Sequence, residues 1–208
     1  MEKKSLYIET ERLIVRSVRE SDAEVLYRVK TDPRVLEYCP DLFDIDAGPE
    51  DMPKYIRAFT KLEEEGDPDP WRVYPIENRE TGEVMGCLTA SLQNMLREYE
   101  LGWMMLGQFT KQGYASEAAA AYAEYFSKTR GIDYMIAVMD VDNPASRRTA
   151  EKAGFRLFEK RTVYDYSYGR YCDDYLYLRR YSSECTLKER FYGDVPYYGR
   201  FTSDKPDL

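Results

Sequence analysis

The spacing of apolar and polar residues changes along the chain, and each change predicts a different element. Apolar and polar residues alternate over residues 12–18, a period of two that is typical of a half-buried strand. The S-x-x-E pattern at residues 21–24 predicts a capped helix start, and this helix must end before Pro33. A second helix is expected over residues 53–65, because Gly66 supplies a helix end.

A β-hairpin is predicted next. Two apolar runs, residues 71–76 and 84–91, flank the turn residues Asn78 and Gly82. Pro75 lies inside the first run and cannot donate a hydrogen bond to a neighbouring strand. We therefore expect this strand to lie at an edge or to contain a bulge.

A strand, a helix and another strand then predict a parallel βαβ crossover. Residues 99–106 alternate, whereas residues 134–141 are almost continuously apolar, as in a strand buried on both faces. The intervening residues 116–129 show the amphipathic pattern of a helix. Its expected apolar face consists of Ala118, Ala119, Tyr122, Tyr125 and Phe126.

A short helix and a closing hairpin complete the predicted elements. Asn143 and Pro144 open the helix, and Gly154 follows its end. The two last strands are expected at residues 155–166 and 175–180, and residues 169–174 are expected to join them. These elements predict the α+β class, with four early strands and a mixed, mostly antiparallel sheet that is parallel only at its centre.

The length and net charge of the chain limit the number of domains and the classes of partner that it can have. The 208 residues suit one domain, expected over residues 1–180, with a tyrosine-rich tail of unknown role at residues 181–208. The net charge of -8 argues against nucleic acid as a partner and leaves room for an acidic mouth that attracts cations. We expect a cytoplasmic protein without a membrane partner, because no signal region or membrane-length apolar run is present.

The absence of histidine excludes whole classes of site. Without imidazole there is no Ser-His-Asp or Cys-His machinery and no histidine metal site. Cys39, Cys87, Cys172 and Cys185 are scattered without ligand spacing, which predicts reduced thiols and no metal centre.

One loop has the character of an anion site. Residues 107–115 leave a strand, contain Gly113 and Ala115, and lead into a helix N-terminus. Amides at such a terminus lack helical partners and face the positive end of the helix dipole, so a diphosphate is a common occupant. The loop matches neither a Walker sequence nor G-x-G-x-x-G, which argues against nucleotide hydrolysis and NAD binding.

Several motifs together resemble the GNAT superfamily of N-acetyltransferases, and most closely its Rim-type ribosomal-protein members. The strongest likeness is D-N-P-x-S followed by E-K-x-G-F, within residues 142–155. The others are Q-G-Y-A-S-E-A at residues 112–118, E-L-G-W at 100–103, T-G-E-V-M-G at 81–86 and T-E-R-L at 10–13. The resemblance covers about residues 7–180, in order and without large gaps.

The resemblance implies an enzyme that binds acetyl-CoA between two splayed central strands and transfers the acetyl group directly to an amine. The family's diphosphate loop maps onto Thr110, Gly113 and Ala115, where Thr110 replaces the usual Gln or Arg. Lys111 stands where glycine is common and would add a positive charge. The implied cofactor-binding residues are Met104, Met105, Leu106, Thr110, Lys111, Gln112, Gly113, Tyr114, Ala115, Ser116, Asn143, Ser146 and Arg147.

The resemblance also implies the catalytic residues. Ala150 stands where many members have a tyrosine that protonates the thiolate, so Ser146 is the implied acid, as in the Rim-type relatives. Glu100 is the implied base, on the strand face that it shares with Gly102 and Met104. An ordinary glutamate pKa of about 4.3 is too low for direct proton abstraction, so burial must raise it or a water must relay the proton.

The acceptor stays open at this level. A weak base suits a peptide α-amine or a small amine better than a lysine, because a lysine costs more free energy to deprotonate. We expect the first two helices and the acidic loop at residues 41–46 to form the acceptor side. The alternatives are another acyl donor, an antibiotic or polyamine acceptor, or a CoA-binding module without activity. A homodimer is compatible with the sequence.

Overall fold

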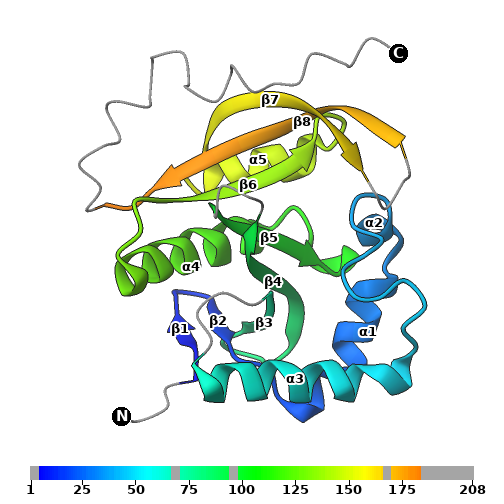
Figure 1. Cartoon of the computed structure of the whole chain (residues 1–208). Helices are drawn as coiled ribbons and strands as arrows, with labels where there is room; N and C mark the ends of the chain where they lie inside the picture. The colour runs from blue at the N-terminus through cyan, green and yellow to red at the C-terminus, as the bar shows by residue number, and fades with distance from the viewer. Residues whose placement is uncertain (1–4, 67–70, 94–97, 166–169, 184–208) are drawn as a thin grey trace.

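The computed structural model describes residues 5–66, 71–93, 98–165 and 170–183. Within these residues one eight-stranded sheet forms the centre of the molecule (Figure 1). Its strands are β1 (Tyr7–Glu9), β2 (Leu13–Arg16), β3 (Arg72–Asn78), β4 (Val84–Gln93), β5 (Glu98–Met105), β6 (Tyr134–Asp140), β7 (Arg156–Asp165) and β8 (Arg170–Tyr181). The helices are α1 (Ala23–Thr31), α2 (Pro33–Leu36), α3 (Met52–Glu65), α4 (Tyr114–Arg130) and α5 (Pro144–Lys152), with 3-10 turns η1 (Glu20–Asp22), η2 (Pro49–Asp51) and η3 (Gly107–Phe109).

The order of the sheet is β1-β2-β3-β4-β5-β6-β8-β7. Every neighbouring pair is antiparallel except β5 and β6, which are parallel and joined through α4. This arrangement confirms the predicted α+β class and the central βαβ crossover.

The two parallel strands separate soon after they meet. In the described part of the chain, β5 and β6 pair only where Glu100 lies opposite Ile136. On its other side β5 pairs with β4 along its whole length, and β6 pairs likewise with β8. Each of the two strands is therefore fully paired with its outer neighbour, whereas a gap opens between β5 and β6. This gap widens toward the carboxyl ends of both strands.

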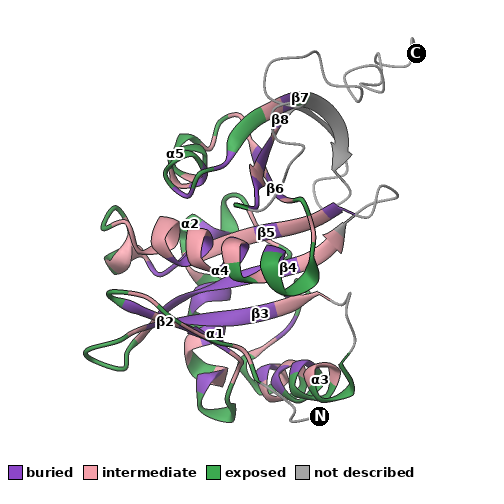
Figure 2. Cartoon of the chain, turned by 90° about the vertical axis from the view of Figure 1, so that its left-hand side faces the viewer, coloured by how far each residue is buried: buried purple, intermediate pink, exposed green. Residues whose placement is uncertain are grey.

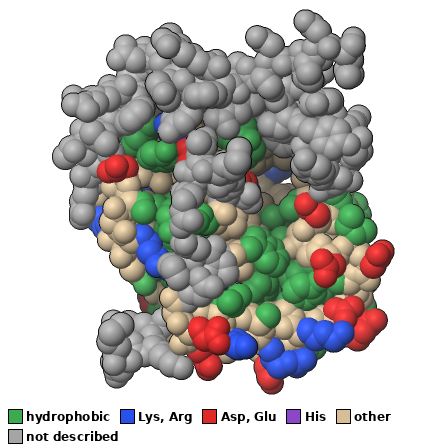
Figure 3. All heavy atoms as spheres, viewed as in Figure 1, with side chains coloured by type: hydrophobic (Ala, Val, Ile, Leu, Met, Phe, Trp, Pro, Cys, Tyr) green, Lys and Arg blue, Asp and Glu red, His purple; other side chains and the backbone are tan. Residues whose placement is uncertain are grey.

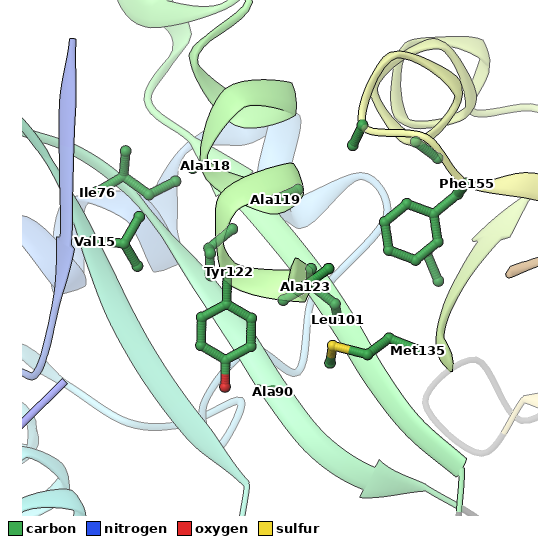
Figure 4. Close-up of a cluster of buried hydrophobic side chains, with 14 of the residues drawn as sticks. Val15, Ile76, Ala90, Leu101, Ala118, Ala119, Tyr122, Ala123, Met135 and Phe155 are labelled. Atoms are coloured by element: carbon green, nitrogen blue, oxygen red, sulfur yellow. The ribbon is translucent and has the colours of Figure 1, made fainter. Parts of the chain in front are cut away.

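Helices cover both faces of the sheet and create two hydrophobic clusters. One cluster packs α4 and α5 against the sheet and includes Leu101, Tyr122 and Phe155 (Figure 4). The other packs α1 and α3 against the opposite face and includes Ile56, with Met104 at its margin. Buried residues run along β3 between these layers (Figure 2). None of the helices in the described residues is long and apolar enough to cross a membrane.

Local sequence signals account for several element ends. Gly66 ends α3 at a φ of 71°, a left-handed conformation that glycine adopts without a Cβ clash. The β3–β4 turn is closed by the side chain of Asn78, whose Oδ1 accepts the amides of Glu80 and Thr81. Strand β3 lies between β2 and β4 rather than at an edge of the sheet, but its pairing with β4 shifts register between Ile76 and Glu77, so of the two expected alternatives the bulge is confirmed. Pro75 itself pairs with β4 and lies beyond the β2 pairing.

Four structural expectations were wrong. The residue 21–24 capping box does not form, because the chain enters α1 through η1 and the Asp22 carboxylate accepts the Arg19 amide instead. Tyr125 is 40% exposed rather than part of the buried face of α4. Strand β8 begins at Arg170, inside the expected joining segment, because its backbone pairs with β7 back to that residue. Finally, β1 makes the early strands five rather than four.

Candidate functional site

A cavity of about 370 Å³ lies where β5 and β6 diverge. Its walls come from both strands, from β4, Trp71 and α5, and from the segment after α2. Its described lining residues are Tyr38, Cys39, Pro40, Asp41, Leu42, Trp71, Thr89, Ser91, Glu100, Leu101, Gly102, Trp103, Met104, Val138, Met139, Asp140, Asn143 and Ser146. Carboxylates are the only charged side chains among them, and the volume suits part of a small-molecule ligand. In Figure 3 red carboxylates line the right-hand edge of a central hydrophobic surface.

Glu100 is a titratable group of this cavity whose pKa the fold changes strongly. Removal from water raises the pKa of its carboxyl group from 4.5 to about 7, and the nearby charge of Glu98 adds to the rise. Glu98 itself pairs with Arg179 at 2.8 Å. A carboxylate with a pKa near 7 can accept a proton from an amine at neutral pH.

Close packing against β4 explains why position 102 is a glycine. It lies opposite Thr89 on β4, and a Cβ at Gly102 would stand 2.4 Å from the Thr89 hydroxyl oxygen. Only a glycine therefore fits beside Thr89 at this point, and it leaves the backbone of β5 open to the cavity.

The first turn of α5 faces the same cavity. Asn143 caps the helix, because its Oδ1 accepts the amide of Ser146 at 2.9 Å. Pro144 follows at the first helical position, where its missing amide costs nothing. This cap brings Asn143 and Ser146 to the cavity wall together with Glu100, although the latter lies more than forty positions earlier in the sequence.

The loop after β5 presents backbone amides at the N-terminus of α4. Gly113 is the N-cap with a φ of 84°, and Lys111 has a φ of 65°, which is rare for a residue with a side chain. These two left-handed residues, two positions apart, turn the chain sharply just before α4. The first amides of α4 have no carbonyl acceptors within the helix. The geometry of this loop therefore fits a diphosphate.

Arg12 and Glu117 hold that loop in place. The Arg12 guanidinium donates to the Gln112 carbonyl at 3.1 Å and pairs with Glu117 at 2.6 Å. Glu117 also accepts the hydroxyl of Thr10, which helps to hold its pKa below the ordinary value. Arg12 stacks on the ring of Tyr114 as well, 4.6 Å from its centre. Thr10 and Arg12 of the T-E-R-L motif thus fix the position of the loop through Glu117 and the Gln112 carbonyl.

Comparison with known proteins agrees with this geometry. A family model described as an acetyltransferase (GNAT) domain matches residues 12–156, which is well over half of the chain. The chain belongs to the GNAT acetyltransferase family. It is an acetyltransferase, as the resemblance of its motifs implied.

Relatives and solved structures of this family match most of the chain. The uncharacterized N-acetyltransferase YoaA of Bacillus subtilis is 29% identical over 167 residues, covering 76% of this chain and 92% of YoaA. A GNAT-family acetyltransferase from Bacillus anthracis superposes with a TM-score of 0.71 at 24% identity, covering 86% of this chain and all of that one. The ribosomal-protein α-N-acetyltransferase RimL, solved with coenzyme A, gives a TM-score of 0.70 at 20% identity, covering 85% and 98%.

Cys39 and Cys87 are poorly suited to a covalent acetyl-enzyme. Burial raises the pKa of the Cys39 thiol to about 12, and the charges of Asp41 and Glu100 contribute. Burial also raises the pKa of Cys87, which has no solvent exposure. Since the thiolate is the nucleophilic form, neither group is activated for acyl transfer. No cluster of potential metal ligands occurs in the residues that the structure describes.

The structure brings some of the implied site residues together and places others elsewhere. Four of them line the cavity: Glu100, Met104, Asn143 and Ser146. Met105 and Leu106 are buried and do not line this cavity, and the Leu106 amide donates to the Met85 carbonyl at 2.9 Å. Arg147 points along α5 and pairs with Glu151 at 2.9 Å.

The remaining implied residues form the loop and the start of α4. Thr110 binds its own loop, with its hydroxyl donating to the Gly107 carbonyl, and the Gln112 amide group donates to the Gln108 carbonyl. Lys111 is exposed, while Ser116 donates to the Gly113 carbonyl. Tyr114 and Ala115 begin α4 and pack against the sheet cluster.

Sequence reasoning missed most of the wall opposite α5. Tyr38, Cys39 and Pro40 line the cavity although they follow a four-residue helix that no periodicity announced. Of the acidic loop at residues 41–46, Asp41 faces this cavity, whereas Asp44 and Asp46 line a separate depression beside α3. The single sequence signal for this wall was its acidic composition.

Proposed function

We propose that this acetyltransferase uses acetyl-CoA and moves the acetyl group directly to an amine nitrogen, with a peptide α-amine or a small amine as acceptor. The observation that carries the proposal is the joint placement of Glu100 and Ser146 on the cavity between the diverging strands. The loop at residues 107–115 would hold the CoA diphosphate through its amides. RimL, a structural neighbour, has been solved with coenzyme A bound.

The reaction needs a proton acceptor and a proton donor at opposite ends of the transfer. The amine nitrogen attacks the thioester carbonyl carbon, and the proton that it loses passes to Glu100, directly or through a water. The C–S bond then breaks, and the departing sulfur takes a proton from the Ser146 hydroxyl, which regains one from water. Glu100 releases the proton that it accepted to solvent. The products are the acetylated amine and free coenzyme A.

The pKa of Glu100 also ranks the acceptors. Deprotonating an α-amine with a pKa near 8 costs about 1.4 kcal/mol at pH 7, whereas a lysine side chain costs roughly 4–5 kcal/mol. A base with a pKa of about 7 is closely matched to the first of these. RimL is described as an α-N-protein acetyltransferase, which is consistent with this preference.

A thiol-release assay tests the proposal. Acetyl-CoA is offered with a peptide carrying a free α-amine, the same peptide blocked at its N-terminus with one internal lysine, spermidine and an aminoglycoside. We expect release of coenzyme A to be fastest with the free α-amine. Faster release with spermidine or the aminoglycoside would favour the alternative acceptors. Binding of coenzyme A without release for any amine would indicate a binding module without activity.

A further inference from the structure

The segment formed by residues 32–38 crosses the open end of the gap between β5 and β6. At its start, the amide of Gly107, just after β5, donates to Asp32 Oδ2 at 2.9 Å. At its end, the Tyr38 hydroxyl donates to the carbonyl of Asp142, just after β6, at 2.9 Å. We call residues 32–38 the bridging segment. Figure 1 shows its helix, α2, beside the arrowhead of β5.

The first contact uses both oxygens of one carboxylate. Asp32 Oδ1 accepts the amide of Arg34 and so caps α2, while Oδ2 accepts Gly107. The fit is close, because a Cβ on Gly107 would stand 1.7 Å from Nη1 of Arg34. The first residue of the proposed diphosphate loop is therefore packed against the first turn of α2.

The second contact is not imposed by burial. The Tyr38 side chain is 37% exposed, so its ring could turn to solvent at little cost, yet its hydroxyl meets the Asp142 carbonyl. Asp142 directly precedes Asn143, the cap of α5, and its own amide is fixed by Asp140 Oδ1 at 2.7 Å. Each end of the bridging segment thus attaches to backbone adjoining a proposed CoA contact.

The chain that follows the bridging segment is the cavity wall at residues 38–42. We propose that Asp32 and Tyr38 are positioning residues that couple the binding of acetyl-CoA to the order of this acceptor-side wall. The proposal rests on the proposed function, because it takes the loop after β5 and the turn before α5 as the CoA contacts. A ligand that holds these two turns then also restrains the wall, and by linkage an ordered wall strengthens CoA binding.

Hydrogen exchange with coenzyme A itself as the probe tests this coupling without an identified acceptor. In the wild type, coenzyme A should slow exchange in residues 107–116 and 143–147 by direct contact. It should also slow exchange at residues 38–42 by about fivefold or more, the usual lower range of coupling between sites. The measured quantity is the change on adding coenzyme A, which a merely structural role would not move.

Two conservative variants remove one tether each. Asp32→Asn keeps a good helix cap but leaves one oxygen to serve two amides, and Tyr38→Phe deletes one hydroxyl from an exposed ring. In both, protection at residues 107–116 should persist while protection at residues 38–42 falls below about twofold, well under the coupling range. The matched controls are Asp51→Asn, which loses a carboxylate that accepts the Gly48 amide, and Tyr55→Phe, which loses a hydroxyl bonded to Asp44.

The outcomes separate the two proposals. Protection at residues 107–116 without any at residues 38–42 in the wild type overturns the coupling and leaves CoA binding in place. Full protection of residues 38–42 in both variants overturns the role of the tethers. Absence of protection at residues 107–116 refutes the CoA site and with it the coupling.

Discussion

Replacing Glu100 with glutamine removes a carboxyl group whose ionisation the fold opposes. The pKa of this group is about 7 in the folded protein and 4.5 when unperturbed, so the folded state retains a proton that the unfolded state releases between these values. The stability linked to this proton is complete below pH 4.5 and is lost as the pH rises through 7. At about 1.4 kcal/mol per pH unit, reduced because water still reaches the half-buried carboxylate, the loss amounts to about 2–3 kcal/mol.

Urea unfolding at a series of pH values from 4.5 to 8.5 measures this effect. The free energy of unfolding of Glu100→Gln relative to the wild type should rise by about 2–3 kcal/mol across the series, with unchanged m-values. Glu80→Gln, on the exposed β3–β4 turn, controls for the loss of one carboxylate. A stability difference that does not vary with pH would refute the raised pKa.

The ionisation of Glu100 should also appear in the pH dependence of kcat/KM. If Glu100 accepts the amine proton, kcat/KM of the wild type rises with pH until about 7, and Glu100→Gln lowers it by about 100-fold or more. The affinity for coenzyme A should change little, because the loop that we propose for the diphosphate is separate from this carboxylate. Wild-type turnover with the variant would exclude Glu100 as the base.

Three further variants test individual features of the site. Ser146→Ala should lower kcat by about tenfold or more while calorimetry shows unchanged affinity for coenzyme A, and an unaltered kcat would exclude the acid role. Gly113→Ala places a Cβ on a residue with a φ of 84°, so unfolding should show a loss of about 1–2 kcal/mol together with weaker coenzyme A binding. Gly102→Ala should cost about 1–3 kcal/mol by its clash with Thr89 Oγ1, and adding Thr89→Ala should recover part of this, whereas independent effects would contradict the packing account.

Much of the fold follows from local pattern. The helix end at Gly66, the turn at Asn78 and the cap at Asn143 were predictable, because each depends on a residue type whose conformation or side-chain reach is fixed. The entry to α1 was not, because Ser21 and Asp22 are both plausible caps and the buried pairing of Asp22 with Arg16 at 2.8 Å decides between them. That pairing depends on tertiary contacts that lie outside the local sequence.

The site likewise contains some features that local sequence predicts and others that depend on tertiary contacts. Glu100 and Ser146 stand in the motifs that carry the resemblance, and the alternation of β5 predicted the observed separation of Leu101 and Met104 onto opposite faces of the sheet. The wall at residues 38–42 and the raised pKa of Glu100 depend on burial between segments far apart in the chain, which no spacing rule encodes. The tethers at Asp32 and Tyr38 belong to this second group.

Calorimetric titration of coenzyme A into the full chain tests the central claim most directly. We predict a single site with a dissociation constant below about 1 mM, within the range usual for enzyme substrates, and weaker binding to Gly113→Ala. Absence of binding to the wild type at millimolar coenzyme A, or equal affinity in the Gly113→Ala variant, would contradict the assignment of the loop after β5 as the seat of the diphosphate.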